Sequence, residues 1–475
     1  MEVVFNTLGL ALLLLFPIVS GKSNTNINSF IPQRLACPEE LRIRPSEHLS
    51  SSEIEWRATR LPRVVESVKG YLTRVNIPGF DTMEYFRKLN HTNVPIIGLS
   101  ISGGGSTSGI GGLGVWQAFD EKYEPARQAG TAGIAQSLTY LTGLSGGGFL
   151  TVSTLASNQF NTIDDIRKAV NFSEDYTTGP SGDQADYIED SISNAVAKQE
   201  SGFPVSITDI FGQWLGTYLP EGWKNNSFSD LARLNTSFSN GTGPMPILGL
   251  AEVIPGRSPK ISNILYPGRN STNGFNLTEY EVTPFEFGSW YGGRVQGFMP
   301  LEWLGSAMRK GTPSGRMCVT DFDRFTFLQG STANAWNIWL IQDFDGTELF
   351  AKRDSPRVPE AGLLPRQDVG APDDVIIPLS KDDDFQAIFL NTTADALGQS
   401  FNDTLWAWVP NPFEDYNDAM MGVSDLLLVD GSEAGETDPL RPLMVPQRNV
   451  DLIIVYEAST DAPYYNCQCI IARLA

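Results

Sequence analysis

The chain has 475 residues, of which 41% are hydrophobic and 19% are charged, so it can bury a large core and is neither disordered nor fibrous in composition. Its formal net charge of −21 disfavours a nucleic-acid partner, because neutralising phosphates requires a basic surface. Two histidines and four cysteines without suitable spacing predict no metal site.

The N-terminus has the pattern of a secretory signal peptide. Leu8 to Val19 is a short apolar run, and the small residues Ser20 and Gly21 follow it. The run is too short for a comfortable membrane span, so we predict a signal peptide over residues 1–21 and a secreted protein, extracellular or associated with the cell wall. An uncleaved anchor is the alternative.

Glycosylation signals and cysteines agree with export. Four cysteines fit one or two disulfides, and a bridge between Cys467 and Cys469 would be strained, so pairing of these two with Cys37 or Cys318 is expected. Nine N-x-Ser/Thr sequons predict a glycosylated surface. They are Asn90, Asn171, Asn225, Asn235, Asn240, Asn270, Asn276, Asn391 and Asn402.

Four apolar runs predict buried strands, and three of them end in turns that could carry function. Continuous β-branched and leucine runs are typical of strands covered on both faces, and helical patterns at 112–123 and 149–158 lie between them. The alternation predicts an α/β fold with a central, largely parallel sheet flanked by helices, and sites at the carboxyl ends of the strands. The predicted strands are 94–102, 138–144, 425–429 and 451–456.

Ser145 lies in Gly143-Leu144-Ser145-Gly146-Gly147, between a predicted strand and a predicted helix. Such a turn holds a serine in a strained, exposed position, and the following helix directs backbone N–H groups at developing negative charge. The motif also arises by chance in glycine-rich loops, but its context favours a nucleophile.

The base that would activate Ser145 is predicted to be Asp430. His91 lies within a sequon and His48 lies in an N-terminal segment, so two surface histidines are the simpler interpretation. A Ser-His-Asp triad is therefore disfavoured. Asp430 ends an apolar run and precedes Gly431, although an aspartate there could instead cap a helix or start a turn.

Two glycine runs follow the first predicted strand. Gly103-Gly104-Gly105 can present successive backbone N–H groups as an oxyanion hole. Residues 109–114 form G-x-G-x-x-G, which would suggest a dinucleotide and an oxidoreductase. The strand ends at Ser102 rather than at this run, so we expect no nucleotide and assign these glycines to close helix packing.

Further short segments occur in the same chain order as in a known family. With the Ser145 turn, they make the region from about Cys37 to the C-terminus resemble the fungal lysophospholipase/phospholipase B family, whose catalytic domain is similar to that of cytosolic phospholipase A2. The segments are Leu49-Ser50 with Glu53 and Trp56, residues 102–105, residues 143–147, Thr283-Pro284-Phe285-Glu286-Phe287-Gly288-Ser289-Trp290, Phe327-Leu328-Gln329-Gly330-Ser331, and Val429-Asp430-Gly431.

The resemblance implies a catalytic domain over residues 36–475, patatin-like or similar to cytosolic phospholipase A2, with inserted cap or loop regions. It implies hydrolysis of fatty-acyl esters of phospholipids or lysophospholipids at a membrane or micelle surface, without a cofactor. Ser145 would be the nucleophile, Asp430 its base, and the N–H groups of Gly104 and Gly105 the oxyanion hole of an acyl-enzyme mechanism.

Two departures from the family pattern matter. The family continues the glycine run with an aromatic residue and an arginine that holds the substrate phosphate, where this chain has Ser106 and Thr107. A weakened enzyme, a substrate with less need of phosphate recognition, or an inactive lipid-binding or cell-wall glycoprotein are the alternatives. The chain also ends earlier than family members, which suggests truncation, and its end at 467–471 predicts no glycolipid anchor.

Overall fold

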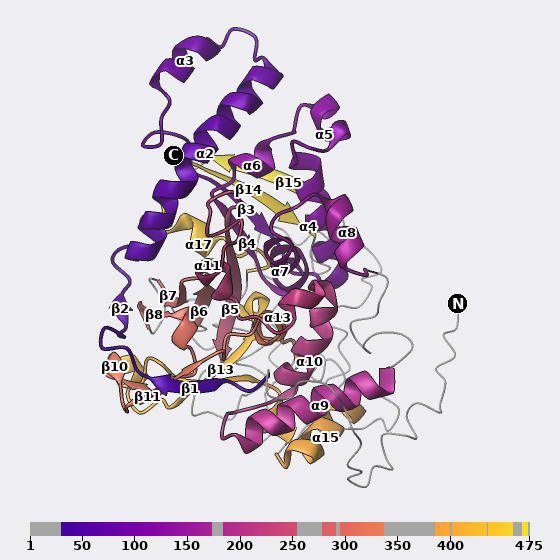
Figure 1. The fold of residues 1–475 in the computed structure, drawn as a ribbon, viewed down its shortest axis with the longest axis vertical. Helices are drawn as coiled ribbons and strands as arrows, with labels where there is room; N and C mark the ends of the chain where they lie inside the picture. Colours follow the sequence, from indigo (N-terminus) through magenta and orange to yellow (C-terminus); the bar gives the residue numbers. More distant parts are fainter. Residues whose placement is uncertain are drawn as a thin grey trace, which may run out of the picture.

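The computed structural model describes residues 30–172, 184–253, 278–290, 295–336, 385–399, 401–434, 436–458 and 468–473 (Figure 1). The predicted signal peptide, Asn270, Asn276 and Cys467 lie outside the described residues. An eleven-stranded sheet forms the centre of the described part. Nine strands follow one another in the spatial order β15 (Gln468–Arg473), β14 (Leu452–Glu457), β3 (Ile97–Ile101), β4 (Tyr140–Gly143), β5 (Met245–Val253), β6 (Thr278–Val282), β7 (Glu286–Ser289), β8 (Gly297–Pro300) and β2 (Arg44–Pro45). The other two strands form a branch, in which β12 (Ala407–Pro410) pairs with β13 (Asp425–Asp430) and β13 pairs with β5.

The predicted α/β fold is confirmed, with a mixed sheet whose centre is parallel. Strands β14, β3, β4 and β5 pair in parallel, and the remaining pairs are antiparallel. Leu99, Ile101 and Leu141 are at most 1% exposed, as expected of strands covered on both faces. All four predicted strands exist, but β13 is antiparallel to β5 and not a member of the parallel set.

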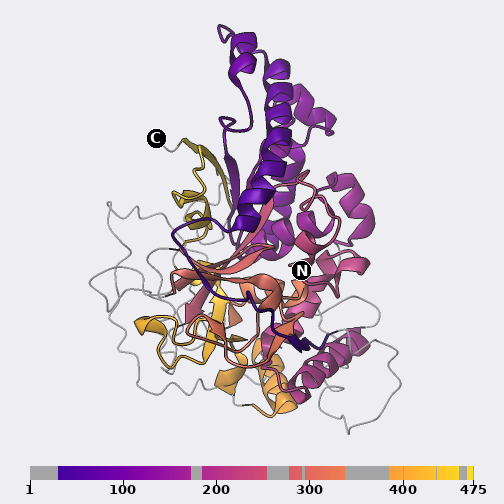
Figure 2. The ribbon, with the colours of Figure 1, turned by 60° about the vertical axis from the view of Figure 1, so that its left-hand side comes forward.

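Helices cover the sheet, and some of them overlap the helical segments expected at 112–123 and 149–158. Helix α4 (Gly105–Phe119) follows β3 directly, and the π-helix η2 (Gly147–Val152) with α7 (Ser153–Ser157) follows β4. The long α2 (Ser51–Val75) and the short α3 (Thr82–Lys88) project from one end of the molecule (Figures 1 and 2). The other α-helices are α5 (Glu124–Ala129), α6 (Ile134–Ser137), α8 (Ile163–Ala169), α9 (Gln184–Glu200), α10 (Ile207–Leu215), α11 (Asp230–Arg233), α13 (Phe325–Thr332), α15 (Phe385–Leu397), α16 (Phe401–Thr404) and α17 (Arg441–Met444).

Two buried arginines join α2 to the sheet and the loops around it. Arg60 donates to the carbonyls of Leu138, at 2.6 Å, and Thr242, at 2.8 Å, just before β4 and β5 begin. Arg448 binds Glu53 at 3.0 Å and Glu281 at 2.6 Å, with all three side chains at most 3% exposed. Burial alone would raise the pKa of Glu53, but the charge and hydrogen bonds of Arg448 bring it below its ordinary value.

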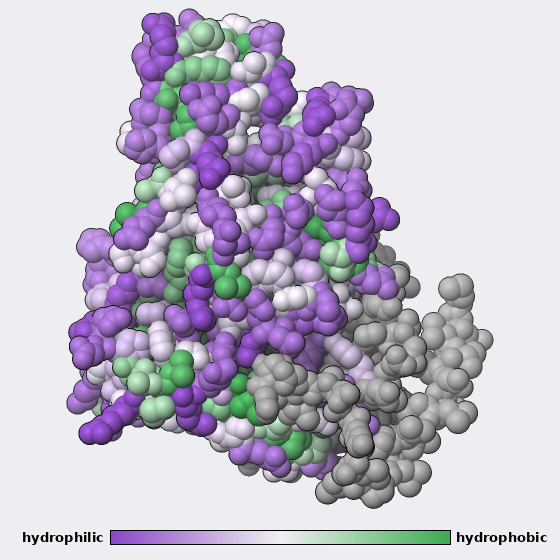
Figure 3. Space-filling view, in the orientation of Figure 1, coloured by the Kyte–Doolittle hydropathy of each residue, from purple (hydrophilic) through white to green (hydrophobic). Residues whose placement is uncertain are grey.

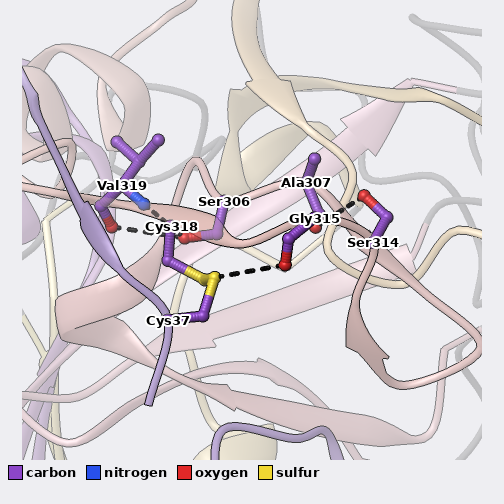
Figure 4. Close-up of a disulfide and its surroundings, with 7 residues drawn as sticks. All are labelled: Cys37, Ser306, Ala307, Ser314, Gly315, Cys318 and Val319. Carbon is purple, nitrogen blue, oxygen red and sulfur yellow. Dashed lines mark hydrogen bonds between the residues drawn. A yellow bond between two sulfur atoms is a disulfide. The ribbon is translucent and has the colours of Figure 1, made fainter. Parts of the chain in front are cut away.

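One disulfide joins Cys37 to Cys318, which corrects the expected pairing with the C-terminal cysteines (Figure 4). Strand β1 (Gln33–Ala36) pairs antiparallel with β11 (Met317–Thr320), and this register places Leu35 opposite Cys318. The two sulfur-bearing residues are thereby adjacent, with Cα atoms 4.8 Å apart. Sequence spacing could not reveal this pairing because 281 positions separate the two cysteines.

Most of the sequon asparagines that the structure describes are exposed to solvent. Six of the sequon asparagines lie exposed in the structure, and the face seen in Figure 3 is mostly hydrophilic with scattered apolar residues. Within the described ranges, no helix combines the length and apolarity that crossing a membrane requires. The six exposed asparagines are Asn90, Asn171, Asn225, Asn235, Asn240 and Asn391.

Candidate active site

The turn at Ser145 has the geometry that its sequence predicts. Strand β4 ends at Gly143, and Ser145 adopts a left-handed backbone conformation with φ of 49° before the chain enters η2. A serine rarely occupies this region, so surrounding contacts must hold it there. A Cβ atom on Gly146 would lie 2.0 Å from the carbonyl oxygen of Gly105, so only glycine fits where the turn meets the loop after β3.

Asp430 lies at the end of β13, which runs towards the end of β4 in the opposite direction. Strands β4 and β13 pair with the same edge of β5, because β6 occupies the other edge. Strand β4 ends with Gly143 opposite Leu248, and β13 ends with Asp430 opposite Leu250. The two strand ends therefore meet tip to tip, about 7 Å apart along β5. This antiparallel approach replaces the arrangement that the sequence suggested, in which all the turns follow parallel strands.

Asp430 is 1% exposed and is held by the turn that follows it. Its Oδ1 atom accepts the backbone N–H of Ser432 at 2.9 Å and the Ser432 hydroxyl at 2.8 Å. Asp430 thus also starts a turn, which was the alternative interpretation of its position. The two roles are compatible, since a carboxylate has two oxygens and several lone pairs.

The loop after β3 lies against Ser145. A Cβ atom on Gly103 would be 3.8 Å from the Ser145 Oγ, and the Gly103 N–H donates to the Thr437 carbonyl at 2.8 Å. Gly104 and Gly105 follow with φ of 121° and 59°, and α4 begins at Gly105. The first N–H groups of a helix have no partner within the helix and point towards its positive end. The start of α4 lies against the Ser145 turn, since a Cβ atom on Gly146 would be 2.8 Å from the Gly105 nitrogen.

Thr107 lies exposed in the first turn of α4, together with Ser106. Arg127 lies on α5, beyond the far end of α4, which at 15 residues is about 22 Å long. Its guanidinium binds the Glu121 carbonyl and the Glu124 carboxylate. Arg127 therefore does not take the place of the missing arginine.

Three of the glycines at 109–114, Gly109, Gly111 and Gly112, serve packing, as the sequence indicated. They lie inside α4 and not at a strand end. A Cβ atom on Gly112 would lie 2.3 Å from the Thr151 Oγ1, and one on Gly109 would lie 2.6 Å from the Leu150 Cβ. These glycines let α4 contact η2 closely, so the G-x-G-x-x-G run gives no support to a nucleotide site.

Both histidines are exposed and lie away from Ser145. His91 precedes β3, at the opposite end of the parallel strands from the Ser145 turn. His48 follows β2, which is five strands from β4 in the sheet. A triad with either histidine is not supported by this geometry.

The end of α13 supports both Ser145 and Asp430, and sequence reasoning missed this. The Thr332 Oγ1 accepts the Ser145 N–H at 3.3 Å and donates to the Gly249 carbonyl at 2.7 Å. Two residues later, the Asn334 carbonyl accepts the Asp430 N–H at 3.0 Å. The segment 327–331 belongs to the family resemblance, but no local pattern reveals that the residues after it contact two distant turns.

A cavity lies beside the two turns, with Leu144 and Gly431 in its wall, and its lining includes three glutamates and Arg441. Its volume of about 40 Å³ holds a few waters and not a lipid head group. Burial and the neighbouring Glu436 raise the pKa of the lining Glu279 to about 7. In the adjacent loop, burial and a hydrogen-bonded carboxyl from β14 raise the pKa of Asp438 to about 9.

The chain is similar in sequence to fungal lysophospholipases. It is 32% identical over 461 residues to lysophospholipase 3 of Aspergillus fumigatus, covering 92% of this chain and 65% of that protein. It is 30% identical over 456 residues to a lysophospholipase of Arthroderma benhamiae, covering 91% of this chain and 63% of that one. The chain thus spans less than two thirds of the length of these relatives.

The fold is similar to that of human GIVD cytosolic phospholipase A2. The TM-score is 0.58 at 16% sequence identity, and the match covers 90% of this chain and 55% of that chain. The model of the lysophospholipase catalytic domain family matches residues 97–357, more than half of the chain. The chain therefore belongs to the lysophospholipase catalytic domain family.

Proposed function

We propose that this chain hydrolyses fatty-acyl esters of lysophospholipids and phospholipids through a Ser145–Asp430 dyad. The meeting of β4 and β13 along one edge of β5 carries the proposal, because it brings a strained serine and a buried aspartate together. The names of the fungal relatives supply the substrate class. No histidine among the described residues lies at the two turns, so the base is assigned to Asp430.

In the proposed reaction the Asp430 carboxylate takes the Ser145 proton while Oγ attacks the ester carbonyl. The N–H groups of Gly104 and Gly105 stabilise the oxyanion. As the tetrahedral intermediate collapses, Asp430 gives the proton to the leaving oxygen, so the lysolipid or glycerophosphodiester departs as a neutral alcohol and Asp430 is again a carboxylate. Asp430 then takes a proton from water, which attacks the acyl-enzyme. Fatty acid leaves and Ser145 regains its proton. An aspartate is a weak base, so the fixed geometry of both turns must contribute strongly to the rate.

Export and glycosylation belong to the same proposal. The N-terminal apolar run, the disulfide between Cys37 and Cys318 and the exposed sequon asparagines all support a secreted glycoprotein. Its substrate would be met at a membrane or micelle surface. A shift in mass after glycosidase treatment of the protein collected from culture medium would test export and glycosylation together.

The decisive assay is fatty-acid release from lysophosphatidylcholine by wild type and Ser145→Ala. Release should fall to background in Ser145→Ala, and a fluorophosphonate probe should label only the wild type. Asp430→Asn should lose hydrolysis while keeping the fold. Equal release by wild type and Ser145→Ala would refute the proposal.

A second candidate is a catalytically weakened or inactive lipid-binding or cell-wall glycoprotein. The exposed Thr107 favours it, since a hydroxyl cannot replace the bidentate charge of a guanidinium. Thr107→Arg should then raise hydrolysis of phospholipids more than that of neutral esters. Ser106→Arg, in the same exposed turn, controls for added positive charge. Probe labelling of wild-type Ser145 would exclude the inactive alternative.

A further inference from the structure

Ser432 makes two contacts with the proposed base. Its backbone N–H and its hydroxyl both donate to Oδ1 of Asp430, at 2.9 and 2.8 Å. The backbone bond alone is an ordinary turn that any residue at 432 would make. The hydroxyl adds a second donor that depends on the side chain, and it lies at a carboxylate that is 1% exposed.

We propose that Ser432 is a positioning residue for Asp430, fixing the carboxylate's orientation and favouring its ionised form. This inference rests on the proposed function. The carboxylate cannot rotate without breaking both bonds to Oδ1, so the direction of Oδ2 is fixed as well. A hydrogen bond to an ionised carboxylate is stronger than one to a neutral acid, so the Ser432 hydroxyl also holds Asp430 in the form that can accept a proton.

Most of the ionisable groups described around this turn are acidic. Glu433 follows on the turn η7 (Gly431–Ala434), and Glu252 on β5 accepts the Tyr280 hydroxyl at 3.0 Å. Both are acidic and oppose ionisation of a nearby carboxylate. The end of α13 contributes the neutral Thr332 and Asn334. Glu279, Glu436 and Arg441 line the neighbouring cavity with Gly431, and the Arg441 guanidinium pairs with these two carboxylates at 3.1 and 3.5 Å. The Ser432 hydroxyl is thus a donor that favours the charged form of Asp430 beside these acidic groups.

The test is the pH profile of lysophosphatidylcholine hydrolysis by Ser432→Ala, with Ser432→Thr as the variant that keeps the hydroxyl. Removing the hydroxyl should lower kcat roughly tenfold, with KM changed less than about twofold, because the contact acts on chemistry and not on substrate binding. The midpoint of the acid limb should move up by roughly half to one pH unit. Ser432→Thr should restore both.

The chain offers a matched control at the other end of β13. Ser424 is exposed and its hydroxyl donates to Asp425, so Ser424→Ala removes the same kind of contact away from the site. If Ser432→Ala fails to fold, Ser432→Cys, a weaker donor of similar size, replaces it. If the wild type is active and Ser432→Ala has the same kcat and the same acid limb as Ser424→Ala, this inference is overturned and the proposed function is not. Equal release by wild type and Ser145→Ala overturns the proposed function as well.

Discussion

Replacing Thr332 by valine removes one hydroxyl that serves two backbone partners, the buried Gly249 carbonyl and the part-buried Ser145 N–H. The side chain is 0% exposed, and valine matches its shape, so the change isolates the hydrogen bonds. The Gly249 carbonyl loses a donor at 2.7 Å, and the Ser145 N–H loses an acceptor at 3.3 Å. Leaving buried groups unsatisfied in this way costs about 1–3 kcal/mol of the free energy of unfolding.

The same change should slow the reaction of Ser145. Its φ of 49° is strained, and the lost contact is one that holds it. A loss of 1–2 kcal/mol in positioning corresponds to roughly 5- to 30-fold slower labelling by a fluorophosphonate probe. Time-resolved labelling measures this rate, and denaturant unfolding measures the stability.

Two variants on the same helix make the experiment discriminating. Thr332→Ser keeps the hydroxyl and should label at close to the wild-type rate. The buried Thr326 hydroxyl has no hydrogen-bond partner among the described residues, so Thr326→Val should leave labelling unchanged and cost little stability. Labelling of Thr332→Val at the wild-type rate would refute the idea that the end of α13 holds the Ser145 turn.

Three further predictions concern packing, the buried ion pairs and pH. Gly112→Ala should lower both Tm and activity, because the new Cβ would lie 2.3 Å from a neighbouring hydroxyl oxygen. In the control Gly114→Ala the new Cβ meets open space and should stabilise α4 by about 1 kcal/mol. Equal Tm values for the two variants would contradict this reasoning. Arg448→Met should lower the free energy of unfolding by about 3–5 kcal/mol, because it leaves two buried carboxylates without their cation. Denaturant unfolding measures this loss, and a loss below about 1 kcal/mol would show that the carboxylates find other partners. Asp438 has a pKa of about 9 in the folded state, and its ordinary pKa is 3.8. The folded protein therefore holds this proton more tightly than the unfolded chain, so the contribution of Asp438 to the free energy of unfolding is fully present below pH 3.8 and is lost as the pH rises towards 9. Asp438→Asn should therefore gain a few degrees of Tm over wild type between pH 5 and pH 8, and an equal gain in the exposed control Glu55→Gln would point to net charge instead.

The amino-acid sequence by itself determined the fold class, the positions of the main strands and the two residues proposed for chemistry. These features are local: apolar runs identify β3, β4, β13 and β14, and glycines around Ser145 identify a tight turn after a strand. The shortage of histidines also makes Asp430 the candidate base. Composition and residue order are sufficient for such conclusions, because each depends on neighbours within a few positions.

Only the tertiary structure decided how those residues meet. The direction of β13 relative to β5 depends on strand pairing across more than 170 positions, and no local pattern encodes it. The pairing of Cys37 with Cys318 follows from the register of β1 and β11, and the contacts of Thr332 with Ser145 and of Asn334 with Asp430 follow from where α13 ends. Long-range pairing is fixed by packing of the whole core, so the sequence could name Ser145 and Asp430 but not the contacts that hold them in place.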